Sequence, residues 1–228
     1  MPRISDPAPE FVGQSTQGTV NFPSDYAGKW VILFSHPADF TPVCTSEFMT
    51  FAMMTEEFRK YNTELVGVSV DGLHSHIAWL RTIRDNMDFR GWKNVDVTFP
   101  LIDDVSMQVS QKYGMIMPGE SETSAVRAVF IIDPAGKVRT ILYYPLSTGR
   151  NFDEILRVVK ALQTTDEFGV ATPADWRPGE RVIVPPAGTM DVAEKRMSGQ
   201  EDGVECADWF FCTKELPEDT IENALQKK

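Results

Sequence analysis

The segment from Lys29 to Phe58 constrains the fold of this 228-residue chain more than any other part. It opens with a short apolar run that has no helical period and therefore predicts a buried strand, Trp30-Val31-Ile32-Leu33-Phe34. A short loop follows, and then residues recur at helical spacing on one face, which predicts an amphipathic helix: Phe48, Phe51, Ala52, Thr55 and Phe58. A strand that leads through a tight loop into a helix is typical of α/β folds.

The same alternation of strands and helices continues to about residue 165. Further strands are expected at Glu64–Asp71, around Phe99–Ile102, at Val126–Ile132 and at Val138–Tyr144. Further helices are expected at Ser75–Asn86, at Asp104–Tyr113 with Gly114 as its stop, and after an N-cap at Asn151. Because Asp133-Pro134-Ala135-Gly136 is a turn sequence, the last two strands form a hairpin. This order predicts an α/β fold with a mixed central sheet and helices on both faces.

Beyond about Thr164 the composition changes to proline-broken segments and short helical pieces. The sequence predicts two domains, residues 1–165 and a C-terminal arm, residues 166–228, that carries Cys206 and Cys212. An arm of this size holds an independent core poorly. Its aromatic residues need burial, so the arm is expected to pack on its own domain or on a neighbouring chain: Trp176, Trp209, Phe210 and Phe211.

Charge and composition exclude several classes of partner. The net charge is −11 and the sequence pI is about 4.8, which argues against nucleic acid or an anionic membrane surface. No stretch approaches the roughly 20 apolar residues of a membrane span, and the N-terminus lacks the apolar segment of a signal peptide. Three cysteines are too few for a disulfide scaffold, so a reducing, cytoplasmic location is expected.

Cys44 is the candidate reactive group, because it falls in the first turn of the predicted helix. Unpaired backbone N–H groups there favour a thiolate, and the thiolate is the nucleophilic form. Thr41 lies three residues earlier and can place its hydroxyl beside the sulfur, while Pro37 can shield the sulfur from water. Arg127, the charged residue in an otherwise apolar strand, is the candidate partner for the thiolate.

Each of these residues also has a structural interpretation, which the sequence leaves open. A lone cysteine at a helix start is often a small buried residue. Thr41 can be an N-cap with Pro42 at the favoured first helical position, and Arg127 can pair with a structural carboxylate. The common spacing of these residues, rather than any one of them, favours the chemical interpretation.

The spacing Pro37-x-x-x-Thr41-x-x-Cys44 resembles the active-site signature of the peroxiredoxins. The surrounding sequence resembles the one-cysteine-type subgroup (peroxiredoxin 6-like), which includes many archaeal and bacterial thioredoxin peroxidases. The likeness extends to the segments Ser124–Asp133, Leu142–Arg150 and Pro173–Trp176 and to Val184-Pro185-Pro186, and so covers nearly the whole chain.

The resemblance implies a thioredoxin-like fold with a C-terminal dimerisation arm, and a thiol-dependent peroxidase that needs no cofactor or metal. Cys44 would attack hydrogen peroxide or an organic hydroperoxide and become a sulfenic acid, with Pro37 shielding the site. Thr41 and Arg127 would bind the substrate, and Arg127 would also stabilise the thiolate. The supporting residues would be Arg150, Glu47 and His36.

For two of these supporting residues the sequence allows two interpretations. Arg150 either orients Glu47 or Arg127, or is a surface residue at a helix start. His36 either contacts the sulfur or is packed at a strand end. His74 and His76 are interpreted as ordinary loop and helix-start residues without a role.

The resemblance also bears on how the sulfenic acid is resolved. The segment that carries the resolving cysteine in common two-cysteine members has Ala171 and Thr172 here. Cys206 and Cys212 resemble the paired C-terminal cysteines of archaeal-type members, and the hypothesis is that a neighbouring subunit's Cys212 or Cys206 reaches Cys44. If both stay reduced, the enzyme is strictly one-cysteine.

The expected partners are a peroxide, a thiol reductant (a thioredoxin-like protein or a small thiol) and a second copy of the chain. Family members form homodimers, often as decameric rings of five dimers. A dithiol oxidoreductase is disfavoured because the chain has no Cys-x-x-Cys pair. A zinc site is disfavoured because Cys206 and Cys212 lack two further ligands close in the sequence. A serine phospholipase is disfavoured because no Gly-x-Ser-x-Gly motif occurs. A ring-forming holdase chaperone and a redox sensor remain as alternatives.

Overall fold

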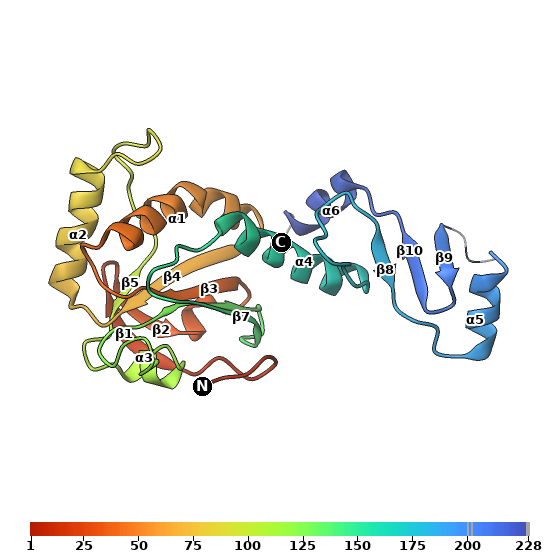
Figure 1. The fold of residues 1–228 in the computed structure, drawn as a ribbon, viewed down its shortest axis with the longest axis horizontal. Coiled ribbons are helices and arrows are strands. Elements are labelled where there is room, and N and C mark those ends of the chain that lie inside the picture. Colours follow the sequence, from red (N-terminus) through yellow and green to blue (C-terminus); the bar gives the residue numbers. More distant parts are fainter. Residues whose placement is uncertain (200, 202, 227–228) are drawn as a thin grey trace. The chain divides into compact units, whose positions relative to one another are not determined.

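The structure, a computed structural model, describes residues 1–199, 201 and 203–226. Its N-terminal part is built on a seven-stranded sheet with the strand order β2-β1-β5-β4-β3-β6-β7 (Figure 1). The strands are β1 (Phe11–Ser15), β2 (Gly18–Phe22), β3 (Trp30–Ser35), β4 (Thr63–Ser69), β5 (Leu101–Asp103), β6 (Arg127–Ile132) and β7 (Val138–Tyr144). β4 pairs in parallel with β3 and β5, whereas β6 pairs antiparallel with β3 and β7, so the sheet is mixed as predicted.

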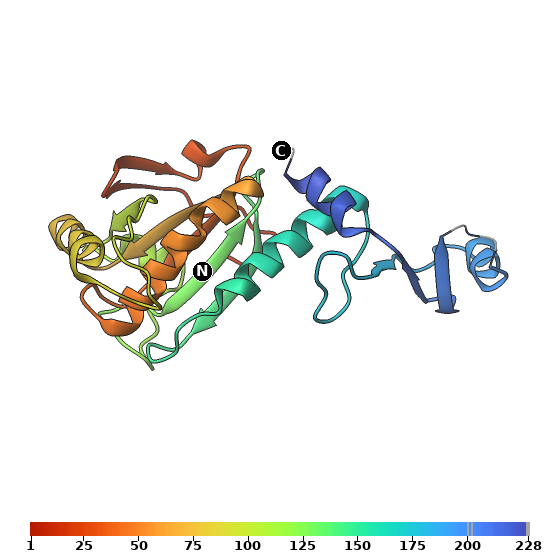
Figure 2. The ribbon, with the colours of Figure 1, turned by 90° about the horizontal axis from the view of Figure 1, so that it is seen from above.

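Helices cover both faces of this sheet. The helices of the chain are α1 (Pro42–Lys60), α2 (Leu73–Asn86), α3 (Gln108–Lys112), α4 (Phe152–Phe168), α5 (Met190–Met197) and α6 (Glu218–Leu225), with a 3-10 turn at Ser24–Tyr26. Because side chains alternate along a strand, neighbouring residues of β3 face opposite sides. Phe34 stacks on Phe51 of α1 with ring centroids 4.2 Å apart, and α1 lies against β4 (Figure 2).

On the opposite face, the core is completed by the segment that ends α3. Phe130 stands opposite Leu33 in the β3–β6 register, and its ring meets Tyr113, which follows α3, at 5.1 Å. The prediction of a mixed sheet with helices on both faces is therefore confirmed.

One expected element differs from the structure near the N-terminal sheet, and one observed element was not expected. The helix expected at Asp104–Tyr113 is confined to α3, because the Asp104 carboxylate accepts the backbone N–H groups of Val109 and Ser110 (3.0 and 2.7 Å) and so sets the helix start. The β1–β2 hairpin has no counterpart in the sequence-based prediction. Its two short strands expose alternate residues and carry few of the apolar runs that mark a strand.

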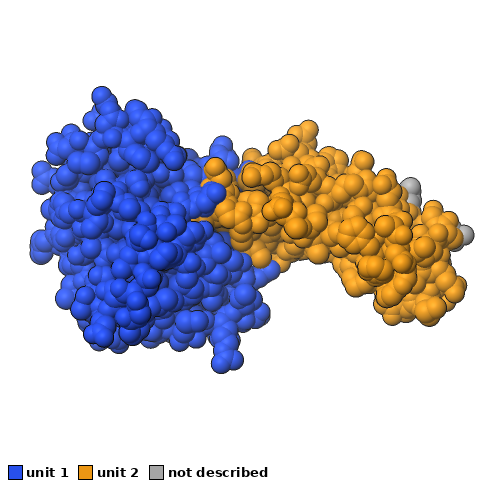
Figure 3. All heavy atoms as spheres, in the orientation of Figure 1, with its two compact units in different colours: residues 1–152 blue, residues 153–228 orange. Residues whose placement is uncertain are grey.

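The chain divides into two compact units, residues 1–152 and 153–228 (Figure 3). The division falls at the start of α4, whereas the sequence-based boundary at residue 165 lies within that helix. The second unit contains a three-stranded antiparallel sheet in the order β8-β10-β9, with β8 (Val182–Val184), β9 (Val204–Asp208) and β10 (Phe211–Lys214). The use of this unit in dimerisation stays a prediction.

The C-terminal unit contains an element that the sequence did not predict. The segment around Cys206 and Cys212, to which no secondary structure was assigned, is a β-hairpin. Trp176 is fully buried, as expected, but the aromatic side chains at the hairpin turn are about half exposed in the single chain: Trp209 at 45%, Phe210 at 56% and Phe211 at 51%. Their burial against a neighbouring chain stays a prediction. Within the described residues, no helix combines the length and the apolar character needed to cross a bilayer.

Candidate active site

The loop between β3 and α1 brings Cys44 to the start of a helix that packs on the sheet. Thr41 occupies the N-cap position with extended backbone angles, and Pro42 is the first helical residue. Proline is favoured there because its missing N–H has no intrahelical partner to lose. Cys44 follows in the first turn, and its side chain is fully buried as a free thiol. The sulfur therefore lies at the positive end of the α1 dipole, away from bulk water.

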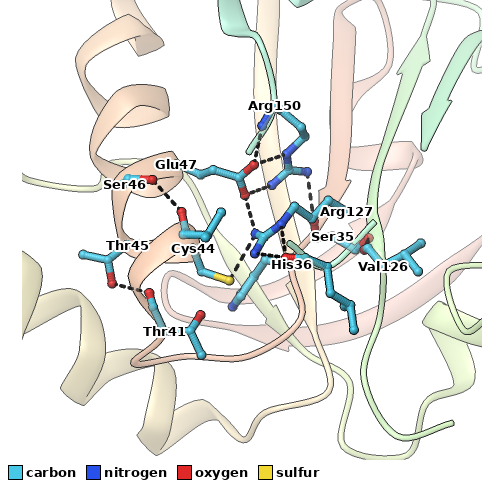
Figure 4. Close-up of polar contacts among 12 residues, drawn as sticks. Ser35, His36, Thr41, Cys44, Thr45, Ser46, Glu47, Val126, Arg127 and Arg150 are labelled. Atoms are coloured by element: carbon cyan, nitrogen blue, oxygen red, sulfur yellow. Dashed lines mark hydrogen bonds and ion pairs between the residues drawn. The ribbon is translucent and has the colours of Figure 1, made fainter. Parts of the chain in front are cut away.

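Arg127 reaches the sulfur from the neighbouring strand (Figure 4). In the β3–β6 register Val129 stands opposite Phe34, so Arg127, two residues earlier, points to the same face of the sheet as Phe34 and α1. Its Nη1 group donates to Cys44 Sγ at 3.2 Å. Its Nε and Nη2 groups donate to the Leu146 carbonyl at 3.0 and 2.8 Å, which fixes the plane of the guanidinium.

Glu47, three residues after Cys44 on the same face of α1, connects two arginines (Figure 4). Its Oε2 accepts from Arg127 Nη1 at 2.8 Å and from Arg150 Nη2 at 2.7 Å, while its Oε1 accepts from the backbone N and Nε of Arg150 at 2.8 and 3.0 Å. Burial alone would raise the pKa of Glu47, but the charge and hydrogen bonds of Arg150, with the charge of Arg127, lower it. The carboxylate is therefore ionised and holds Arg127 beside the sulfur.

Arg150 is buried rather than a surface residue at a helix start. Its Nη1 group donates to the carbonyl oxygens of Ser35 and Ala128 at 2.9 and 3.0 Å, so it ties the ends of β3 and β6 together. Of the two interpretations that the sequence allowed, the structure has the one in which Arg150 contacts Glu47.

Thr41 and Pro37 lie in the loop that precedes Cys44. Thr41 makes no side-chain cap of α1; its hydroxyl donates instead to the Ala38 carbonyl at 2.9 Å. The oxygen of that hydroxyl keeps lone pairs that can accept a further hydrogen bond. Pro37 is partly buried in the same loop.

A buried carboxylate between two histidines lies in the same loop. Asp39 Oδ1 is 2.9 Å from His36 Nε2, and Asp39 Oδ2 is 2.8 Å from His76 Nδ1. Burial alone would raise the pKa of Asp39, but the hydrogen bonds from His36 and His76 hold it well below its usual range. Both histidines therefore donate to an ionised carboxylate.

His36 is packed at the end of β3, one of the two interpretations that the sequence allowed, whereas His76 differs from its sequence-based interpretation. His36 is fully buried, and burial lowers its pKa despite the hydrogen bond to Asp39. Its other nitrogen, Nδ1, has no hydrogen-bond partner among residues 1–199, 201 and 203–226. His76 is also fully buried and is not an ordinary helix-start residue, whereas His74 is exposed. The signal that was missed is the spacing of His76 and Trp79, which places both on the inner face of α2.

The structure provides little for a metal ion at this place. His36, Asp39 and Asp71 offer ligand atoms within 4.8 Å of one another. However, Asp71 Oδ2 already accepts from the backbone N of Asp39 and from the hydroxyl of Ser69. Both oxygens of Asp39 and this oxygen of Asp71 are thus already bonded to protein donors.

Cys206 and Cys212 form a disulfide with each other, in facing positions of β9 and β10 with Cα atoms 4.0 Å apart. Cys212 is buried, while Cys206 is partly exposed. In this arrangement neither sulfur is free to bond to Cys44.

Comparison with known proteins places this geometry in a family. Residues 4–141 match the AhpC/TSA family, and residues 161–200 match the C-terminal domain of 1-Cys peroxiredoxin. A peroxiredoxin of Methanosarcina mazei is 59% identical over 214 residues, which cover 94% of this chain and 98% of the relative. A peroxiredoxin of Aquifex aeolicus is 50% identical over 226 residues, covering 95% and 98% of the two chains.

Solved structures give the same result for the fold. A cysteine-to-serine mutant of peroxiredoxin 6 of Arenicola marina superposes with a TM-score of 0.83 at 32% identity, covering 96% of this chain and all of that chain (100%). The yeast mitochondrial 1-Cys peroxiredoxin superposes with a TM-score of 0.80 at 36% identity, covering 95% and 100%. The fold is therefore thioredoxin-like, as the resemblance implied. With relatives this similar along nearly its whole length, the chain belongs to the peroxiredoxin family of thiol-dependent peroxidases.

Proposed function

We propose that Cys44 is the peroxidatic residue and that it reduces hydrogen peroxide and organic hydroperoxides. The observation that carries this proposal is the 3.2 Å contact from Arg127 Nη1 to the buried Cys44 Sγ. A guanidinium stays charged, so this contact favours the thiolate over the thiol. The Glu47 carboxylate and the Leu146 carbonyl fix the guanidinium, so no reorganisation is needed when the substrate arrives.

In the proposed reaction the thiolate attacks one peroxide oxygen, a sulfur–oxygen bond forms and the oxygen–oxygen bond breaks. Cys44 is oxidised to a sulfenic acid, while the leaving oxygen takes up a proton and departs as water or an alcohol. Arg127 stabilises the negative charge that develops on the leaving oxygen. The Thr41 hydroxyl positions the peroxide by a hydrogen bond, and Pro37 keeps bulk water from the sulfur.

The resolution step is assigned to the C-terminal arm of a neighbouring subunit. The thiol of Cys212 or Cys206 attacks the Cys44 sulfenic acid, which forms a disulfide and releases water. The remaining thiol then attacks the arm sulfur of that bond, which frees Cys44 and leaves Cys206 bonded to Cys212. The disulfide between these two residues in the described chain is consistent with this end state. A thiol reductant, a thioredoxin-like protein or a small thiol, then restores both thiols.

The proposal also includes a homodimer, in which the arm of one chain meets the site of the other, and a cytoplasmic location. The exposed aromatic side chains of the hairpin turn support an arm that packs on another chain. Rings of five dimers are the larger assembly to test, by sedimentation of the reduced and oxidised protein.

The test of the function is peroxide turnover by the full chain with a thiol reductant. Turnover with wild type and its loss in Cys44→Ser would support the proposal, because serine keeps the size but not the nucleophile. Equal turnover in both would refute it. Suppression of client aggregation that survives Cys44→Ser would favour a holdase chaperone, and oxidation of Cys44 without sustained turnover would favour a redox sensor.

A further inference from the structure

The loop that joins β3 to α1, residues 36–41, is held from outside by one side chain of α2. We propose that His76 is a positioning residue, which acts through Asp39 to hold this loop in the arrangement that reacts with peroxide. This inference rests on the proposed function of Cys44 and adds a residue to its site that does not touch the sulfur. We call residues 36–41 the catalytic loop.

The Asp39 carboxylate is the point of attachment. Each of its oxygens accepts one imidazole N–H, at 2.9 Å from His36 and at 2.8 Å from His76. His36 belongs to the loop itself, so that contact closes the loop on itself. The contact from His76 is different in kind, because it connects the loop to another element.

His76 is fixed on its far side as well. Its Nε2 group lies 3.2 Å from the backbone carbonyl of Ile102 in β5, and its side chain is fully buried. Both ring nitrogens therefore lie within hydrogen-bond distance of an oxygen atom. Through this ring the catalytic loop is linked to a strand of the central sheet.

The loop needs such an anchor because Phe40, the residue after Asp39, has an unfavourable backbone conformation. Phe40 has φ +56°, in the left-handed region that bulky side chains rarely adopt, and its side chain is 57% exposed. An unfavourable conformation persists only where the surroundings hold it in place. The backbone N of Asp39 also donates to Asp71 at 2.9 Å, so the anchors converge on the residue just before Phe40.

The next residue after Phe40 is Thr41, the proposed peroxide ligand, which begins α1. A displacement of Asp39 is therefore passed directly to the Thr41 hydroxyl and to the first turn that carries Cys44. A second contact from α2 supports this view: Trp79, one turn after His76, donates its indole N–H to Thr45 at 3.2 Å. The inner face of α2 thus holds both the catalytic loop and the first turn of α1.

The decisive experiment compares two substitutions at position 76 that keep different halves of the imidazole. His76→Asn places an amide N–H near the position of Nδ1 and keeps the bond to Asp39. His76→Gln reaches the position of Nε2 and leaves Asp39 Oδ2 without a donor. His74→Gln, at an exposed position of the same helix, is the matched control.

The measurement is the second-order rate constant for oxidation of reduced Cys44 by hydrogen peroxide in a single turnover. We expect His76→Gln to lower it by about 10- to 100-fold, since misplacement of a reacting group by about 1 Å can cost about 100-fold. We expect His76→Asn to stay within about threefold of wild type and His74→Gln to be unchanged, because both keep the donor to Asp39. Alkylation of Cys44 by iodoacetamide should rise in His76→Gln, because a loosened loop exposes the sulfur.

Asp39→Asn gives an independent route, since it keeps the side-chain volume but loses one of the two acceptors, and it should lower the rate as His76→Gln does. Thermal melting checks that each variant is folded at the assay temperature. An unchanged peroxide rate in folded His76→Gln, or an equal fall in His76→Asn, would overturn this inference while leaving the proposed function intact. A wild-type Cys44 that peroxide does not oxidise would overturn both.

Discussion

The most informative perturbation outside the sulfur itself is Glu47→Gln. This change keeps the shape of the side chain but removes the buried negative charge that lies between Arg127 and Arg150. The Glu47 carboxylate accepts four N–H groups, two at each oxygen. A glutamine side chain offers one carbonyl oxygen, so two of these bonds are lost and its amide N–H faces other donors.

The expected loss of stability follows from this count. Hydrogen bonds to charged groups contribute about 1.5–3 kcal/mol each, so the loss of two lowers the free energy of unfolding by about 3–6 kcal/mol. For a chain of this size, about 2–4 °C of melting temperature per kcal/mol predicts a fall of roughly 6–24 °C. The rate of Cys44 oxidation should fall as well, because Arg127 then keeps the Leu146 carbonyl but loses its carboxylate partner.

The pH dependence gives a second, independent check. Because the pKa of Glu47 is lowered in the folded protein, its contribution to stability is fully present above the unfolded value of about 4.3. It is lost as the pH falls through the lower, folded value. The difference between wild type and Glu47→Gln, measured by urea unfolding, should therefore be constant near neutral pH and shrink below about pH 4.3. Equal stability at pH 7, or a difference that grows on acidification, would refute the assignment of Glu47 as the ionised link.

Substitutions at four further positions test the remaining parts of the site. Arg127→Lys should lower the rate of Cys44 oxidation by peroxide by about 100-fold, because one ammonium cannot replace the guanidinium contacts to Cys44, Glu47 and Leu146. Stopped-flow oxidation measures this rate, and a change below about threefold would contradict the prediction. Thr41→Val should lower the same rate by about 10- to 100-fold while Thr41→Ser stays near wild type, since only the hydroxyl is at stake; equal rates in both variants would exclude the hydrogen bond to the peroxide. Cys212→Ser and Cys206→Ser should leave the first oxidation step unchanged but lower turnover with a protein dithiol by about tenfold or more; undiminished turnover would make the enzyme one-cysteine.

The sequence was most informative where a residue conflicts with its local pattern. Arg127 is the charged residue in an apolar strand, and the alternation of side chains along β6 is enough to direct it toward α1. Cys44 and Glu47 share a helix face at a spacing of three residues, so the sequence alone could have predicted that both contact the same guanidinium. The distances and the link through Arg150 required the structure, because they depend on how two strand ends and a loop meet.

The sequence was less informative where the structure depends on contacts between distant residues. In the sequence His76 is one polar residue of an amphipathic helix, and nothing local indicates that Asp39 lies beside it, 37 positions away. The hairpin around Cys206 and Cys212 was missed for a related reason. Its strands are short, and its aromatic residues lie at an exposed turn rather than in an alternating pattern.

The most direct test of the central proposal is peptide mapping by mass spectrometry after one equivalent of hydrogen peroxide has reacted with the fully reduced chain. The peptide that contains Cys44 should carry the first oxidation, as a sulfenic acid or as a disulfide to a peptide with Cys212 or Cys206. Cys44→Ser should leave the peroxide unconsumed on the same timescale. An unmodified Cys44 in wild-type protein that has consumed the peroxide would contradict the proposal.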